Sequence, residues 1–94
     1  LAARSLEAGL HLSRGRWAEA RAVAEVQLRR ARDRGRVYAV ADAAITLATA
    51  EAELGGDWTA PLRSAAKTLR AKKAPGALNL LVARWGEVRR AAAT

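Results

Sequence analysis

The side chain with the widest chemical range in this sequence is His11, the only histidine. Its nearest partner for metal binding is Glu7, four residues earlier, and two ligands make only half of a metal site. Ser5 and Ser13 lie nearby, but neither forms the arrangement of nucleophile, base and orienting group that activates a hydroxyl. The sequence therefore predicts no catalytic centre, no resident metal and no cofactor. We expect the protein not to be an enzyme.

Cationic side chains are the second feature that could bind a ligand. Seventeen Lys and Arg against nine Asp and Glu give a net charge of +8. Two clusters concentrate this charge, and together we call them the basic rim: Arg29, Arg30, Arg32, Arg34, Arg36, Lys67, Arg70, Lys72 and Lys73. A shared edge carrying both clusters would suit phosphates or an acidic partner. No recognisable nucleic-acid-binding motif accompanies them, and an arginine-rich composition inherited from a genome rich in G and C is an alternative explanation.

The composition limits what can position these residues. A chain of 94 residues fits one small domain, and 25 of its residues are alanine, with no Phe, Met or Cys. Alanine favours helices that approach one another closely, but each alanine buries little area. The absence of cysteine points to a reducing compartment. No apolar run approaches the roughly 20 residues of a membrane span, so we expect a cytoplasmic protein without a membrane partner.

Hydrophobic periodicity divides the chain into four to five helices and predicts an all-α fold of stacked antiparallel hairpins. Gly15, Gly35 and Gly55–Gly56 end helices, 73–76 is a turn by composition, and Thr59 can cap the helix that follows it. The predicted helices span 2–14, 17–34, 36–54, 59–72 and 77–91. We expect a single helical-repeat domain over 1–94, an excerpt of a larger protein, built from hairpins 2–34 and 36–72 and a capping helix 77–91.

The helix predicted at 36–54 has the clearest two-sided pattern. Its apolar side should face the core and carries Val37, Val40, Ala41, Ala44, Ile45 and Ala48. A separate polar stripe recurs every three or four residues: Tyr38, Asp42, Thr46, Thr49 and Glu53. We expect Asp42, Thr46, Thr49 and Glu53 to be accessible to solvent.

Two turns share one signature. Leu12 precedes Gly15-x-Trp17-x-x-Ala20, and Leu54 precedes Gly56-x-Trp58, at an offset of 42 residues between the two leucines. These motifs resemble the tetratricopeptide repeat family, in its longer form found in bacterial regulators. The offset exceeds the roughly 34 residues of that repeat, and Pro61 replaces the small alanine in the second copy. A HEAT-like array, with a period of about 40–47 residues, stays open.

The resemblance implies a protein or peptide ligand on a concave surface lined by the first helix of each hairpin. Candidate groove residues on those helices are Glu7, His11, Tyr38, Asp42, Thr46, Thr49 and Glu53. A solvated helix face is the alternative interpretation of the same polar residues. By analogy, the host is a bacterial signalling or transcription-regulatory protein. Direct binding of nucleic acid by the basic rim is the alternative function, and the sequence leaves the oligomeric state open.

The two tryptophans of the signature turns are predicted to be buried wedges where helices cross. Since an alanine-rich core has little capacity to fill a void, replacing Trp17 or Trp58 by alanine should cost about 3–5 kcal/mol.

Overall fold

The structure, a computed structural model, describes residues 16–93, and all regular secondary structure in that range is helical. Four helices follow one another there: α2 (Trp17–Asp33), α3 (Val37–Glu53), α4 (Thr59–Ala71) and α5 (Pro75–Ala93). The predicted all-α fold is confirmed, and every observed helix begins and ends within two residues of its predicted bounds. The helix predicted at 2–14, which carries Glu7 and His11, lies outside the described residues.

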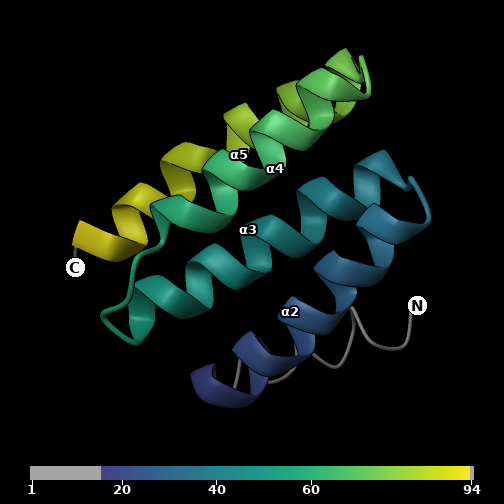
Figure 1. Cartoon of the computed structure of the whole chain (residues 1–94). Helices are drawn as coiled ribbons and strands as arrows, with labels where there is room; N and C mark the ends of the chain where they lie inside the picture. The colour runs from purple at the N-terminus through teal and green to yellow at the C-terminus, as the bar shows by residue number, and fades with distance from the viewer. Residues whose placement is uncertain (1–15, 94) are drawn as a thin grey trace.

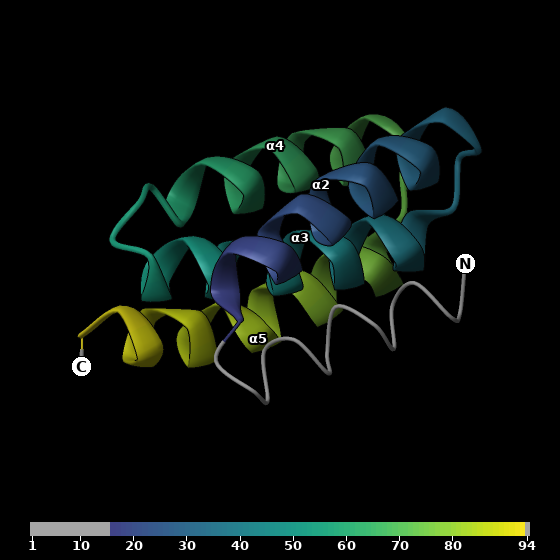
Figure 2. The ribbon, with the colours of Figure 1, turned by 90° about the horizontal axis from the view of Figure 1, so that it is seen from below.

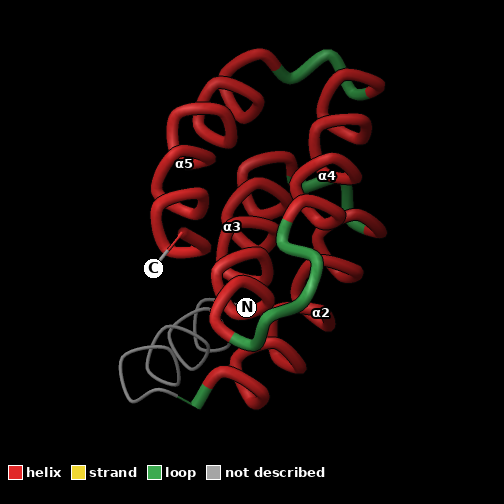
Figure 3. The backbone as a smooth tube through the Cα atoms, turned by 90° about the vertical axis from the view of Figure 1, so that its left-hand side faces the viewer, coloured by secondary structure: helices red, strands yellow, loops and turns green. Residues whose placement is uncertain are grey.

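Helix α3 occupies the centre of the described bundle. It packs directly against α2, α4 and α5 (Figure 1). Seen from below, α2 and α4 form one layer and α3 and α5 form the second (Figure 2), and the same division is visible from the side (Figure 3). Consecutive helices are antiparallel because each connection between them is short. The result is a two-layer stack of hairpins.

The first three described helices end in the same way. In each, the second residue after the cap donates its backbone N–H to a carbonyl five residues earlier, as in Arg36 N to Ala31 O at 3.0 Å, Gly56 N to Glu51 O at 2.8 Å and Ala74 N to Leu69 O at 3.0 Å. This closure needs a residue with positive φ. Glycine supplies it after α2 and α3, with φ of +65° at Gly35 and +76° at Gly55, but after α4 the residue is Lys73, with φ +53°.

Helix α5 begins two residues earlier than the sequence pattern predicts, at Pro75 rather than residue 77. Proline is favoured at the first helical position because its fixed φ suits the helix and its missing N–H would have no partner there. The carbonyl of Ala74 accepts the first helical hydrogen bond, from the N–H of Leu78 at 3.0 Å. The predicted turn is therefore shorter than its composition suggests.

The core is made of alanine contacts and a few large aliphatic side chains. Ala41, Ala44 and Ala48 of α3 have no exposed surface, so neighbouring helices lie directly on this stripe. The largest fully buried side chains are Leu62, Leu69, Leu81, Val40 and Val88. They come from α3, α4 and α5, and each supplies more apolar area than an alanine. The described hydrophobic core is therefore concentrated around these three helices.

The apolar side predicted for α3 is largely confirmed: Val40, Ala41, Ala44, Ile45 and Ala48 are buried, and Val37 is half-buried. The two-sided pattern is incomplete, however, because Ala43, Leu47 and Ala50 on other faces of α3 are buried as well. A central helix is covered from several directions, and small residues allow this without disturbing the helical pattern. Consequently only a narrow strip of α3 is left for polar side chains.

The tryptophans predicted as buried wedges are less buried than expected. Trp17, Trp58 and Trp85 are all half-buried. Trp17 is the first residue of α2 and Trp58 precedes the first residue of α4, so both indoles lie at helix ends, where solvent reaches them. Trp58 does pack against the core cluster. The loss of about 3–5 kcal/mol applies to a buried aromatic, so for these half-buried indoles we expect a smaller loss on replacement by alanine.

Asp57, rather than Thr59, caps the start of α4. Its Oδ1 accepts hydrogen bonds from the backbone N–H of Thr59 at 3.0 Å and from the Thr59 hydroxyl at 2.6 Å. These bonds, the one from the hydroxyl first, lower the pKa of Asp57 below its ordinary value of 3.8. Thr59 itself is the first helical residue, so its side chain donates to the cap instead of providing it.

The capping carboxylate makes the stability of α4 depend on pH. A carboxyl whose pKa is lowered by folding stabilises the folded state above its ordinary pKa of 3.8, and this stabilisation is lost as pH falls through the folded value. We expect Asp57→Ala to lower the melting temperature at neutral pH and to have a much smaller effect near pH 2. Thermal unfolding of parent and variant at both pH values checks this. An equal difference at the two pH values would contradict it.

Candidate interaction surface

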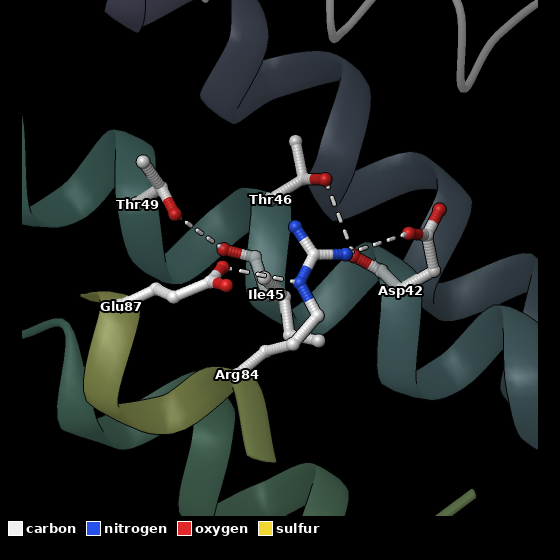
Figure 4. Close-up of polar contacts among 6 residues, drawn as sticks. All are labelled: Asp42, Ile45, Thr46, Thr49, Arg84 and Glu87. Atoms are coloured by element: carbon white, nitrogen blue, oxygen red, sulfur yellow. Dashed lines mark hydrogen bonds and ion pairs between the residues drawn. The ribbon is translucent and has the colours of Figure 1, made fainter. Parts of the chain in front are cut away.

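The polar stripe of α3 meets α5 along a surface that we call the inner face, made of Asp42, Thr46 and Thr49 with Arg84 and Glu87 of α5 (Figure 4). Arg84 Nη1 lies 3.9 Å from Asp42 Oδ1, and its Nε donates to Glu87 Oε2 at 3.3 Å. One guanidinium therefore lies between two carboxylates and offsets part of their negative charge.

The two threonines of the inner face use their hydroxyls locally. Thr46 Oγ1 donates to the carbonyl of Asp42 at 3.2 Å, and Thr49 Oγ1 donates to the carbonyl of Ile45 at 2.9 Å (Figure 4). Both side chains are half-buried, less accessible than expected, whereas Asp42 and Glu53 are exposed as expected. Hydroxyls bonded back to their own helix can still accept a hydrogen bond but have no free donor.

Tyr38 and Glu53 do not join this group, because they lie at opposite ends of α3. The Tyr38 side chain is 59% exposed, and its hydroxyl lies so close to Gly76 that a Cβ there would collide with it. Tyr38 thus lies over the first turn of α5, beside the connection that follows α4. The structure brings Asp42, Thr46 and Thr49 together and separates the other two described groove candidates from them.

Both clusters of the basic rim lie at the end of the bundle where Tyr38 is found. The connections α2–α3 and α4–α5 are at this end, and α3–α4 is at the other (Figures 1 and 2). Arg32 Nη2 donates to Ser64 Oγ, which links the last turn of α2 to α4. This is the shared edge expected if hairpins stack in parallel.

The cations of the basic rim are largely free to meet a partner. All are exposed except Arg32, which is half-buried. None of them makes an ion pair with another residue in the range 16–93. Unpaired cations at one end of a protein create a local positive potential that attracts acidic groups.

Two open depressions adjoin these cations. The first, of about 380 Å³, is lined by Leu28 and Leu47 together with the charged side chains of Glu25, Arg29, Arg32 and Asp33. The second, of about 400 Å³, lies where α4 turns into α5 and is lined by Leu69, Ala74, Pro75 and Leu78, with two cations, Arg70 and Lys73. The second depression, which we call the α4–α5 depression, combines apolar walls with positive charge and no carboxylate.

Sequence reasoning missed two parts of this surface. Arg84 lies beside the buried residues of α5. A cation in that position is a signal that the side chain pairs with a carboxylate on a neighbouring helix, here Asp42. The second omission is the exposed apolar flank of α5. Leu78, Leu81, Val82, Trp85 and Val88 recur at helical spacing and would be expected to share one apolar side, but only Leu81 and Val88 are fully covered, and Val82 is 59% exposed.

Within residues 16–93, no group of three or more His, Asp or Glu side chains is placed to hold a metal ion. None of the described helices is long and apolar enough to span a bilayer.

Comparison with known proteins assigns no family to this chain. A scan of protein-family models, a search of curated proteins and a search of solved structures each found no match to this chain.

Proposed function

We propose that this chain is a non-enzymatic helical module that binds an acidic segment of a partner protein through its basic end. The observation that carries the proposal is the α4–α5 depression, where Arg70 and Lys73 stand beside apolar walls formed by Leu69 and Leu78. Such a site offers an apolar anchor position and electrostatic attraction together. Protein interfaces use this combination of a buried apolar centre and a charged rim.

The apolar walls favour a protein partner over a nucleic acid. A phosphate backbone is bound by cations and gains nothing from an aliphatic depression, whereas a leucine or phenylalanine side chain would fill it. Direct binding of nucleic acid is the second candidate, and the net charge of +8 and the unpaired cations of the basic rim support it. The two candidate functions differ in one respect: only binding of a protein partner needs Leu78 and its apolar neighbours.

The two-layer stack of hairpins supports the tetratricopeptide-like interpretation of the signature turns, in which interaction surfaces are formed by successive hairpins. That interpretation also makes the inner face an alternative docking surface, where Asp42 is the exposed carboxylate of α3, and Glu53 is a further exposed carboxylate at the end of the same helix. The host we propose is a bacterial signalling or transcription-regulatory protein. A cytoplasmic location agrees with the absence of cysteine from the sequence.

Two labelled probes of similar negative charge test the proposal by fluorescence anisotropy. One is a peptide designed as an amphipathic helix, with leucines on one face and glutamates beside them, and the other is a short DNA duplex. The proposal predicts that the peptide binds and that replacing its leucines by serine weakens binding about tenfold or more. Binding of the duplex without binding of the peptide would overturn the protein partner and favour the nucleic acid.

Charge variants then locate the surface. Arg30→Glu with Arg34→Glu reverses two cations of the basic rim, whereas Asp42→Ala with Glu53→Ala removes the exposed carboxylates of α3. Binding of the acidic peptide should weaken in the arginine variant and stay unchanged in the carboxylate variant. Weakening confined to the carboxylate variant would place the site on the inner face.

A further inference from the structure

Helix α4 carries a cationic stripe beside its buried side. Arg63, Lys67 and Arg70 recur at the four- and three-residue spacing of one helix face, and all three are exposed. They flank the fully buried Leu62 and Leu69. Ser64, which binds Arg32 of α2, lies on the opposite flank of the same helix. The cationic stripe therefore faces away from α2.

Helix α5 carries an apolar stripe with the same spacing, formed by Leu78, Val82 and Trp85. It adjoins the side where Leu81 and Val88 are buried, and its two end residues, Leu78 and Trp85, are half-buried and pack partly against the core. The other flank of α5 turns toward α3, because it is there that Arg84 reaches Asp42. The apolar stripe thus lies on the flank away from Arg84, and Val82 at its centre is 59% exposed.

These two stripes belong to one surface, which we call the α4–α5 face. Arg70 of the cationic stripe and Leu78 of the apolar stripe both line the α4–α5 depression. In Figures 1 and 3 the α4–α5 pair forms the edge of the bundle opposite α2, and no other described helix lies over that edge. The face combines an apolar strip along α5 with a parallel row of cations along α4.

Lys73 adds an independent sign that charge is needed at this place. The equivalent closing positions after α2 and α3 are glycines, which adopt positive φ without steric cost. Lys73 adopts φ +53° although its Cβ makes that conformation unfavourable, and its side chain lines the α4–α5 depression. A residue that keeps a cation where glycine would be more stable fits a binding role.

We propose that the α4–α5 face binds an amphipathic helix from an acidic partner protein. The apolar side of the partner helix packs on Leu78, Val82 and Trp85, and carboxylates along one edge of that helix pair with Arg63, Lys67 and Arg70. Each stripe spans about 10 Å, or two turns of a helix, which matches the spacing of anchors in helix-in-groove recognition. This inference rests on the proposed function and narrows it to one face and one kind of partner.

Charge decides between this partner and the other possible occupants. A second copy of this chain would bring another net charge of +8 against the cationic stripe, and like charges repel. A nucleic acid would satisfy the cations but would leave Val82 and Leu78 facing a charged backbone. Only an acidic helix with an apolar side complements both stripes.

The test uses the labelled acidic amphipathic peptide described above. Arg63→Glu with Arg70→Glu should weaken its binding more than tenfold, and Val82→Glu should weaken it about tenfold. These side chains are exposed, so helicity and melting temperature should remain near those of the parent. Arg30→Glu with Arg34→Glu is the matched comparison, because it makes the same change of charge at the α2–α3 connection and should weaken binding by a smaller factor.

Lys73→Gly is a variant in which weaker binding could not be explained by misfolding. It removes the unfavourable conformation together with the charge, so the melting temperature should rise while binding of the peptide weakens severalfold. Tighter or unchanged binding in this variant would overturn the role of Lys73 in the site.

The remaining outcomes separate this inference from the proposed function. Equal weakening in the Arg63/Arg70 and Arg30/Arg34 variants, with none in Val82→Glu, would overturn the α4–α5 face but leave an acidic partner at the basic end. No binding of the peptide by the parent would overturn both. Sedimentation that shows a dimer of the parent, dissociated by Val82→Glu, would identify the face as a contact between copies and overturn the acidic helix.

Discussion

Replacing Leu69 by alanine is expected to lower the free energy of unfolding by about 2–5 kcal/mol. Leu69 is fully buried in the core cluster and belongs to the helix that joins the central α3 to α5. The alanines around it have no rotatable side chains with which to fill the space that the substitution leaves. Because small domains are only marginally stable, a loss of this size removes much of the total stability. Urea unfolding followed by far-ultraviolet circular dichroism measures it.

Leu54→Ala is the matched control for this prediction. The substitution is chemically identical, but Leu54 follows α3 and is 42% exposed, so its effect should be a fraction of that of Leu69→Ala. Similar losses in the two variants would show that α4 is not packed on the core as the structure has it.

Replacing Ala44 by leucine is expected to destabilise the fold by about 1–3 kcal/mol, although leucine is more hydrophobic and nearly as good a helix former. Ala44 lies in the middle of α3 and has no exposed surface, so a larger side chain must push a neighbouring helix away. The same denaturation experiment measures the effect. Ala22→Leu, on the exposed side of α2, is the control and should change the stability by less than about 0.5 kcal/mol. A stabilised Ala44→Leu variant would contradict the central position of α3.

Most of the helical structure could be predicted from local signals. Gly35 and Gly55 mark the ends of α2 and α3 because their positive φ closes the helices. Pro75 was assigned to a turn, since proline is common both in turns and at the first position of a helix, and composition does not distinguish these roles. Lys73 carried no local signal at all, because lysine, unlike glycine, does not favour positive φ.

Burial around α3 and α5 was harder to predict. Periodicity identifies the centre of an apolar side but not how many neighbours cover its flanks, so Ala43 and Leu47 of α3 are buried where a two-sided helix would be open. For the same reason Val82 is exposed although it belongs to the apolar side of α5. Alanine weakens the pattern further, since it is compatible with either environment.

The candidate surface was only partly visible in the sequence. Parallel stacking of hairpins accounts for the position of both cationic clusters at one end. The pairing of Arg84 with Asp42 depends on how α5 lies across α3, which no local pattern specifies. The cationic stripe of α4 and the apolar stripe of α5 likewise become one surface only when the α4–α5 connection places Arg70 beside Leu78.

Mapping the binding of the acidic amphipathic peptide by heteronuclear NMR is the most direct test of the central claim. In a titration of the isotope-labelled chain, we expect the largest changes of amide chemical shift on α4, on the α4–α5 connection and on α5 as far as Trp85. The indole N–H signal of Trp85 should shift with them. Changes concentrated on the inner face around Asp42 and Thr46, or confined to the α2–α3 connection, would contradict it.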